Sequence, residues 1–581
     1  MHLPLKQYWD LLNRYLKPQT PRVFLLSSLI LTNITLRLIN PQIMRYFIDT
    51  ATNAGKLSDL LNAGILFISL AIASQIIAIG STYLSEQVAW NATNSLRLDL
   101  LVHVLQLDAS FHKEHTPGEL LERIDGDVNI LSNFFSRLTI YLISNLFLML
   151  GILVLLFLED WRIGFGVSIF TILALLYMLR IRSIATPYWI KVRQISAEYF
   201  GFIGETLTAM EDVRANGAER YILRRFHQIM QKWYPWRLRA MMALSVTRMS
   251  NVGFAAFGSA VAFAISAYLL SGGSLTIGGV YLIFYYVEML SMPMVMVRNQ
   301  IENLQQAEAS ISRIKTLIAT KSKLIDGSAG LLPEGPLTVS FKQVNFSYER
   351  DHRVLEQVSF DLQAGRVLGL LGRTGSGKTT IARLLLRLYD PLDGEILLND
   401  TAPAAVPLRN LRHRVSMVTQ DVQLFQATIR ENLTLFNPKI SDDRILSAIQ
   451  DLGLSEWFET LPDGLETRLE SGGASLSAGQ AQLLAFARVF LANPGLVILD
   501  EASSRLDPVT ERLVERAVSR LLHHRTGIII AHHLETVQRA DDILILENGH
   551  VLEYGERVSL AAEPNSHFTQ LLRTGLGEVL A

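Results

Sequence analysis

Long uncharged stretches dominate the first 300 residues of the chain. They cover residues 60–85, 138–158, 163–179 and 249–287, and the last is divided by Ser-Gly-Gly-Ser at 271–274. About 20 apolar residues cross the hydrocarbon core of a bilayer as a helix, so these stretches predict five membrane spans. A sixth candidate, residues 23–44, is interrupted by Arg37, Asn40 and Pro41. A buried helix of a soluble domain would explain one such stretch but hardly five.

The distribution of Lys and Arg predicts which ends of the spans face the cytoplasm. Basic residues gather between the second and third spans and between the fourth and fifth, whereas the opposite connections carry little more than Lys56 and Arg162. Excess Lys and Arg mark the cytoplasmic side, so both termini and everything after residue 300 are expected there. The two basic segments have helical patterning, and we expect the membrane helices to continue below the bilayer to turns near Phe111 and Met210.

The pattern changes after about residue 318. Gly, Ser and Pro punctuate residues 319–336, which is typical of a linker, and from Leu337 short β-branched runs alternate with helical patterns. This alternation indicates a parallel sheet covered by helices. We therefore expect an N-terminal elbow segment (1–22), an all-α transmembrane domain (23–318) and an α/β domain (337–581). The spans are expected at about 23–44, 60–85, 138–158, 163–180, 249–270 and 278–300.

Composition agrees with a membrane part and argues against a nucleic-acid partner, disulfides, thiolate metal sites and a signal peptide. Charged residues make up 18% of the 581 residues, against about 25% in an average soluble protein. The net charge of −1 gives no reason to expect a nucleic-acid partner. The absence of cysteine excludes disulfides and thiolate metal sites. The N-terminal segment has no short apolar core followed by a small-residue cleavage site, so we expect no signal peptide.

A glycine-rich loop follows a predicted buried strand at 366–371 and opens a predicted helix from Ile381. Glycines let successive N–H groups converge on phosphates, and the helix N-terminus adds a favourable dipole. Lys378 supplies a cation to the β- and γ-phosphates of ATP, and the Thr379 hydroxyl can bind Mg²⁺. The residues predicted to bind ATP are Gly372, Arg373, Thr374, Gly375, Ser376, Gly377, Lys378, Thr379 and Thr380.

A second predicted strand, residues 496–499, ends in two carboxylates, Asp500 and Glu501. Phosphoryl transfer depends on positioning and charge neutralisation. Asp500 is therefore expected in the Mg²⁺ shell, and Glu501 is expected to polarise the attacking water. Taken alone, the two carboxylates could instead be an acidic cap on the next helix; the phosphate loop favours the catalytic interpretation.

With these motifs the chain resembles an ATP-binding cassette (ABC) transporter of the exporter type, a half-transporter with six spans fused to one P-loop ATPase domain. The segment Leu476 to Gln480 is similar to the signature loop of that family, which opens a helix aimed at the γ-phosphate of ATP on the opposite subunit. This likeness implies that Ser477, Ala478, Gly479 and Gln480 contact the ATP that is bound to the partner subunit. Ala478 replaces the usual glycine, and Ser477 is also expected to cap the helix.

Further site residues are implied by the resemblance alone. Tyr348 resembles the aromatic residue that stacks on adenine, and Gln420 the glutamine that reaches Mg²⁺ and the attacking water. Asp507 resembles the cross-subunit aspartate, and His532 the histidine that contacts the γ-phosphate. With Glu501, these assignments make Gln420 and His532 the catalytic side chains, and Thr379, Gln420 and Asp500 the Mg²⁺ ligands.

The resemblance implies a dimer, because one signature loop completes the ATP site of another chain; homodimer and heterodimer stay open. It also implies an integral membrane protein, of the bacterial plasma (inner) membrane, that moves an amphipathic or hydrophobic drug, lipid or peptide by alternating access. An importer on the exporter fold and an ATP-gated channel or regulatory subunit are the alternatives. Arg37 and Glu288 fall inside predicted spans. Since an intramembrane charge is costly, we expect them to pair, to line the cavity, or to make snorkelling and structural contacts.

Overall fold

The computed structural model describes residues 13–137, 142–328, 330–349, 352–470, 476–500, 508–531 and 537–574. The chain divides into two compact units. The helical unit comprises Met1–Leu105 and Pro117–Thr320, and the sheet unit comprises Gln106–Thr116 and Lys321–Ala581. The division follows the change of pattern in the sequence, except that one short segment of the helical half belongs to the sheet unit.

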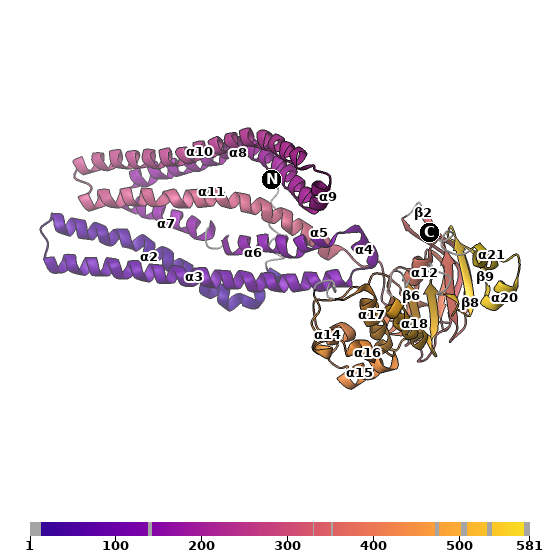
Figure 1. Cartoon of the computed structure of the whole chain (residues 1–581). Helices are drawn as coiled ribbons and strands as arrows, with labels where there is room; N and C mark the ends of the chain where they lie inside the picture. The colour runs from indigo at the N-terminus through magenta and orange to yellow at the C-terminus, as the bar shows by residue number, and fades with distance from the viewer. Residues whose placement is uncertain are drawn as a thin grey trace. The chain divides into compact units, whose positions relative to one another are not determined.

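Long helices that run alongside one another make up the helical unit (Figure 1). They are α2 (Thr20–Thr52), α3 (Leu57–Gln106), α7 (Ser144–Glu159), α8 (Trp161–Thr208), α10 (Glu219–Ser271) and α11 (Ile277–Ala319). Short elements connect them: η1 (Lys17–Gln19), α5 (Pro117–Leu121), η2 (Glu122–Gly126), α6 (Asp127–Arg137) and α9 (Met210–Ala215). Among the described residues, five helices are long and apolar enough to cross a membrane, and α7 is a shorter apolar helix.

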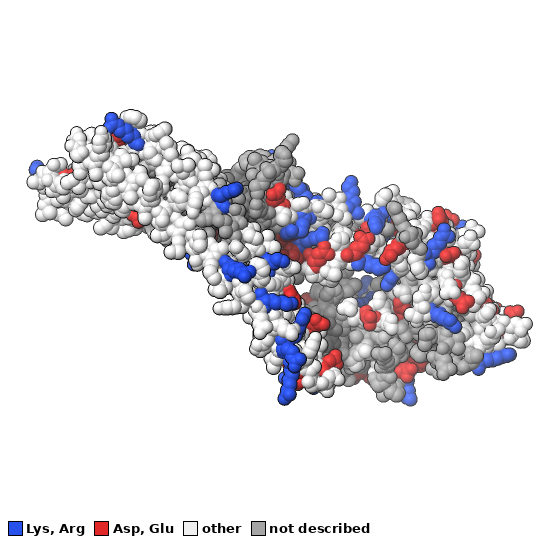
Figure 2. All heavy atoms as spheres, turned by 90° about the horizontal axis from the view of Figure 1, so that it is seen from above, with Lys and Arg blue, Asp and Glu red and all other residues white. Residues whose placement is uncertain are grey.

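Two observations on these helices bear on the expected spans. The α2 helix runs unbroken through Pro41, although hydropathy made residues 23–44 the weakest span. Membrane helices tolerate proline where neighbouring helices satisfy the freed backbone groups. Figure 2 shows a stretch of the helical unit whose visible surface is almost free of charged side chains. Such a surface is what a hydrocarbon environment requires.

Contacts between α11 and earlier helices hold the helical unit together. The fully buried Tyr286 donates a hydrogen bond to the Leu38 carbonyl (2.7 Å) and lies 3.2 Å from the Gln42 side-chain nitrogen. Near the C-terminal end of α11, Arg313 binds the fully buried Asp127 carboxylate. Its Nε donates a hydrogen bond to Oδ2 of Asp127 at 2.8 Å. The Ser310 hydroxyl donates to the same carboxylate at 2.8 Å. These contacts fix α11 to α2 near one end and to α6 near the other.

The sheet unit contains a six-stranded sheet and a three-stranded sheet. The six-stranded sheet has the order β5-β6-β7-β3-β8-β9, in which only β9 is antiparallel, and the three-stranded sheet is antiparallel with order β2-β1-β4. The strands are β1 (Val339–Glu349), β2 (His352–Leu362), β3 (Val367–Gly372), β4 (Asp393–Leu398), β5 (Val415–Val418), β6 (Leu496–Asp500), β7 (Thr526–Ile530), β8 (Asp542–Glu547) and β9 (His550–Glu556). Parallel strands joined by helices are the α/β arrangement expected from the sequence.

Side chains that alternate along β3, β6 and β7 divide the hydrophobic core of this unit in two. Leu368, Ile498 and Ile528 pack with the three-stranded sheet and α12, whereas Val497 and Ile529 pack with the helices of the opposite face. The helices of the unit are α12 (Lys378–Leu385), α13 (Leu408–Arg414), α14 (Ile429–Thr434), α15 (Asp442–Asp451), α16 (Ser455–Phe458), α17 (Ala478–Ala492), α18 (Pro508–Leu522), α20 (Arg557–Ala562) and α21 (His567–Thr574). Core on both faces makes the sheet a rigid support for the loops at its edge.

The short helix α4 (Ala109–Glu114) lies in the sheet unit, although it follows the long helix α3 in sequence. Asp108 caps it, accepting hydrogen bonds from the amides of Ser110 (2.9 Å) and Phe111 (3.2 Å). The same carboxylate accepts a hydrogen bond from the Lys323 amide at 2.6 Å. Phe111 is buried and stacks on His115 with 4.3 Å between ring centroids. The turn expected near Phe111 is therefore an anchored part of the sheet unit.

Candidate nucleotide site and transmembrane pocket

The buried strand β3 leads directly into the glycine-rich loop. Gly372 and Gly377 have φ values of 147° and 107°, which side chains rarely adopt, and a Cβ at Gly372 would collide with the Leu546 carbonyl. Gly377 is the N-cap of α12. The loop therefore ends where the free N–H groups of a helix start, which is the arrangement that a phosphate site requires.

Two side chains in the loop are placed to receive a phosphate. The Lys378 ammonium is buried and donates hydrogen bonds to the carbonyls of Gly372 (2.5 Å) and Arg373 (3.1 Å). The Ser376 hydroxyl is buried and has no hydrogen-bond partner among the described residues. A buried hydroxyl of this kind fits a ligand oxygen. The remaining loop residues are the exposed Arg373, Thr374 and Gly375, the half-buried Thr379 and the buried Thr380.

Strand register brings the other candidate residues to the same edge of the sheet. Ile530 of β7 pairs with Leu370 of β3 on one side and with Asp500 of β6 on the other. The carboxyl ends of these parallel strands are therefore level, two residues before the glycine-rich loop begins. Val418 of β5 pairs with Leu499, so Gln420 follows at the same edge. The hydroxyl of Thr379 and the oxygens of Gln420 and Asp500 are the hard donors that suit Mg²⁺.

Three candidate residues lie outside the described residues. Glu501 and Asp507 fall within 501–507, and His532 falls within 532–536. Glu501 directly follows Asp500, and His532 comes two residues after Ile530.

The signature-like loop caps a helix through a reciprocal pair of hydrogen bonds. The Ser477 hydroxyl accepts from the Gln480 amide (3.2 Å), and the Gln480 side chain accepts from the Ser477 amide (3.0 Å). This is a capping box at the start of α17. Gly479 is buried, whereas Ser477 and Ala478 are exposed. Among the described residues, the methyl group of Ala478 is therefore exposed rather than packed against the rest of the chain.

Tyr348, at the end of β1, lies beside the glycine-rich loop and is held on several sides. Its hydroxyl lies 3.2 Å from the Thr380 hydroxyl and accepts a hydrogen bond from Arg383 at 2.9 Å. Perpendicular contacts with Phe346 and Tyr389 fix the ring, at centroid distances of 4.9 and 5.1 Å. A fixed aromatic ring next to a phosphate loop can serve as a stacking surface for a nucleotide base.

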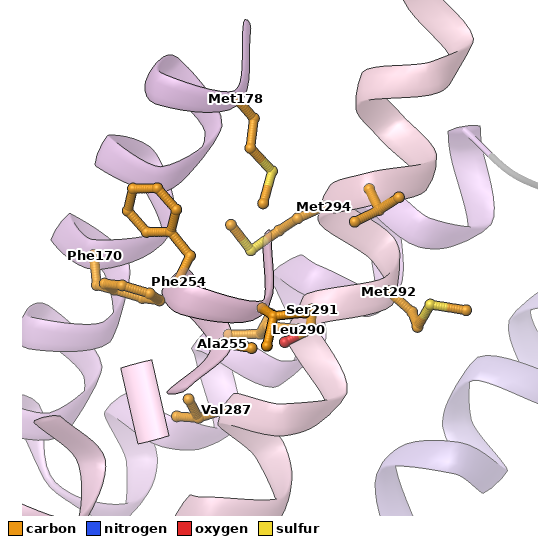
Figure 3. Close-up of a pocket in the computed structure, with 11 residues that line it drawn as sticks. Phe170, Met178, Phe254, Ala255, Val287, Leu290, Ser291, Met292 and Met294 are labelled. Carbon is orange, nitrogen blue, oxygen red and sulfur yellow. The ribbon is translucent and has the colours of Figure 1, made fainter. Parts of the chain in front are cut away.

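The helical unit contains an apolar pocket of about 200 Å³ between α8, α10 and α11. Ser291 contributes the single polar side chain of the described lining. Met178 and Met294 extend toward one another across the pocket, and Phe170 and Phe254 lie beside them (Figure 3). A cavity of roughly 150 Å³ with an aliphatic and aromatic lining binds benzene. This pocket has room for an aromatic ring or for part of an alkyl chain.

The intramembrane charges Arg37 and Glu288 are both exposed in the described chain, and no ion pair joins them there. Arg45 of α2 instead forms an ion pair with Glu159 of α7, with 2.7 Å between nitrogen and oxygen. Arg45 also lies 3.7 Å from Asp49. The described residues therefore show no pairing of Arg37 with Glu288 within one chain. That these two side chains line a transport cavity is a proposal.

Comparison with known proteins identifies the class of this chain. Residues 23–294 match the model of the ABC transporter transmembrane region, and residues 355–504 match that of the ABC transporter. An uncharacterized ABC transporter ATP-binding protein of Bacillus subtilis is 30% identical, over 96% of this chain and 92% of its own length. ATP-dependent lipid A-core flippase 1 of Colwellia psychrerythraea is 31% identical, over 83% of this chain and 82% of its own.

The same fold occurs in a solved structure. A bacterial Atm1-family ABC exporter with ATP bound superposes with a TM-score of 0.80 at 25% identity, over 96% of this chain and 98% of that one. These findings define an ATP-hydrolysing membrane transporter. The chain belongs to the ABC transporter family, as an exporter half-transporter with its transmembrane and ATP-binding domains fused. The resemblance and fold class predicted from the sequence are confirmed.

Sequence reasoning missed the basic residues around Tyr348. The Lys113 ammonium lies 4.7 Å from the centroid of the Tyr348 ring, and Arg383 lies 5.8 Å from it. Arg383 follows the phosphate loop within α12, so its position could have been inferred from helix periodicity. Lys113 comes from α4, far away in sequence, and no local pattern indicates its contact.

Proposed function

We propose that this chain is half of a dimeric, ATP-driven exporter that moves an amphipathic or hydrophobic molecule out of the cytoplasm or the inner leaflet by alternating access. The apolar pocket between α8, α10 and α11 carries this proposal. A related protein is named a lipid A-core flippase, and another of Mycobacterium bovis a fatty acid transporter. Both names denote lipid-type molecules, whose apolar parts suit an apolar pocket of about 200 Å³.

The depth of the pocket supports the proposal that the transported molecule is taken from the inner leaflet. We place the start of α11 at the outer surface, because the basic connections assign the opposite ends of the helices to the cytoplasm. Its pocket residues, Val287 to Val295, then lie about 15 to 27 Å below that surface at 1.5 Å per residue. The hydrocarbon core is about 30 Å thick, so the pocket falls largely in its inner half. The plasma membrane, with the sheet unit in the cytoplasm, is the proposed location.

The roles proposed at the ATP site combine the position of the loop at the edge of the sheet with the family resemblance, which alone supplies those of Tyr348, Gln420, Asp507 and His532. Lys378, Ser376 and the loop amides hold the phosphates, and Tyr348 stacks on adenine. Thr379, Gln420 and Asp500 would hold Mg²⁺, which neutralises phosphate charge during hydrolysis. Glu501 positions the attacking water, and His532 contacts the γ-phosphate. Ser477 to Gln480, with Asp507, serve the ATP of a second half-transporter.

The pocket can be tested by filling it. Ala255→Phe places a ring in the pocket, whereas Ala256→Phe adds the same ring at the exposed neighbouring position, which does not line it. The purified protein in lipid nanodiscs is screened for ATPase stimulation by fatty acids, phospholipids, amphipathic drugs and peptides. We expect an apolar or amphipathic compound to stimulate the wild type and Ala256→Phe, and Ala255→Phe to lose most of that stimulation while keeping basal activity.

Three outcomes would contradict the proposal. Stimulation that survives Ala255→Phe unchanged would separate the substrate from this pocket. Absence of stimulation by every apolar compound, with a polar solute active instead, would overturn the substrate class. Equal loss in both variants would point to helix packing and would also count against the pocket.

A further inference from the structure

Lys113 connects α4 to the ring on which adenine is proposed to stack. Its ammonium lies 4.7 Å from the centroid of the Tyr348 ring, within the distance at which a cation and an aromatic face attract one another. Lys113 is exposed and both residues belong to the sheet unit. The contact therefore occupies a surface that a nucleotide base would use.

The Tyr348 ring has little freedom to move away from this contact. Its hydroxyl is held by Thr380 and Arg383, and its ring is held between Phe346 and Tyr389. The start of α4 is also fixed, because the Asp108 carboxylate binds the Lys323 amide and Phe111 is buried. The flexible part of the arrangement is the long side chain of Lys113 itself.

We propose that the Lys113 ammonium and the adenine ring of ATP compete for the face of Tyr348, so that nucleotide binding releases Lys113 from the ring. The inference rests on the proposed function, in which Tyr348 stacks on the base. A stacked base needs the ring face in contact, and a cation over the same face excludes it. ATP must therefore displace Lys113, whereas α4 remains anchored through Asp108 and Phe111.

This competition predicts a gain in affinity when the cation is removed. Lys113→Met keeps the length of the side chain and removes its charge. An exposed cation–π contact is weak, so binding of the ATP analogue AMP-PNP should tighten about two- to five-fold. Inorganic tripolyphosphate has no base, and its binding should stay equal or weaken slightly because one positive charge is lost. Lys113→Arg keeps a cation and should bind AMP-PNP as the wild type does.

The test is calorimetric titration of the full-length protein in nanodiscs with AMP-PNP and with tripolyphosphate. Lys321→Met removes the same charge from an exposed position of the sheet unit and should change neither affinity. In a Tyr348→Ala background, AMP-PNP should bind more weakly and Lys113→Met should give no gain. A gain only with the base, and only when Tyr348 is present, is a signature that altered helix packing would not produce.

The results separate failure of this inference from failure of the proposed site. Unchanged or weaker AMP-PNP binding in Lys113→Met would overturn the competition, as would an equal gain for tripolyphosphate or a gain that persists without Tyr348. If Tyr348→Ala bound AMP-PNP with unchanged affinity, Tyr348 would not be the base platform, and the proposed site would itself be wrong.

Discussion

The Lys378 ammonium donates a hydrogen bond to the Gly372 carbonyl oxygen 2.5 Å away, so the cation is held by the loop in which it lies. In the proposed site, binding a phosphate would exchange this neutral partner for a charged one. The cation is thus positioned before ATP arrives, and little reorganisation is needed.

Lys378→Met should reduce ATPase activity by at least roughly 100-fold, because it removes a buried cation from the developing phosphate charge. Steady-state phosphate release measures this loss. Lys321→Met is the matched control and should keep wild-type activity. Activity within a few-fold of the wild type in Lys378→Met would remove Lys378 from the site, provided that its thermal midpoint is unchanged.

Complementation tests whether Lys378 works with Ser477 of another chain. Lys378→Met and Ser477→Arg chains should each be inactive alone as homodimers. When the two are mixed, a heterodimer contains one intact site, formed by Lys378 of one chain and Ser477 of the other. Recovery of up to roughly a quarter of wild-type activity is therefore expected from random pairing and one site in two. Failure to recover any activity, with heterodimers shown by two-tag purification, would contradict the shared site.

Asp108→Asn should loosen α4 at neutral pH. Burial alone would raise the pKa of Asp108, but hydrogen bonds from the Lys323 and Phe111 amides and from Ser110 lower it below the ordinary 3.8. A lowered folded-state pKa stabilises the fold above the ordinary pKa, and this stabilisation is lost as pH falls through the lowered value. Hydrogen exchange of residues 106–116 should be faster in Asp108→Asn at pH 7 by several-fold.

The difference between wild type and Asp108→Asn should shrink as the carboxyl protonates. Exchange measured at a second pH below the ordinary pKa of 3.8, corrected for intrinsic rates, should therefore show a smaller difference, since protonation of Asp108 removes its charge. A difference that is the same at both pH values would assign the effect to side-chain geometry and would refute the role of the charge.

Arg313→Met should destabilise the helical unit, because it leaves the fully buried Asp127 carboxylate without its cation. The Arg313 side chain is itself 48% exposed, so the loss should be well below the roughly 3 kcal/mol that breaking a fully buried pair costs. The thermal midpoint of the purified protein should fall, while Arg220→Met, at an exposed position on α10, should not change it. Adding Asp127→Leu to Arg313→Met should restore part of the loss. A midpoint unaffected by Arg313→Met would show that the pair contributes no stability.

Local patterns allowed the fold and the phosphate loop to be predicted. Gly372 to Thr380 lies between a strand and a helix, and each part can be read from adjacent residues. The uncharged stretches predicted the membrane helices for the same reason, although Pro41 made α2 look weaker than it is, because a helix in a membrane tolerates proline.

Contacts between residues far apart in sequence could not be predicted in this way. Hydropathy placed Arg37 and Glu288 in spans, but it carries no information on which helix faces which, and the structure shows Arg45–Glu159 instead. Similarly, the contact of Lys113 with Tyr348 depends on where α4 packs. Local sequence patterns predict the order of the helices and strands, whereas the packing of these elements determines which distant side chains are in contact.

ATP-dependent movement of a lipid-like probe tests the account most directly. The wild type and Glu501→Gln are reconstituted in proteoliposomes that contain a fluorescent fatty acid or short-chain phospholipid, and ATP and Mg²⁺ are supplied to the side of the sheet unit. We predict that the wild type moves the probe away from that side, and that Glu501→Gln binds ATP without sustained movement. Movement by the wild type that is equal with and without ATP, or transport toward the nucleotide side, would contradict the account.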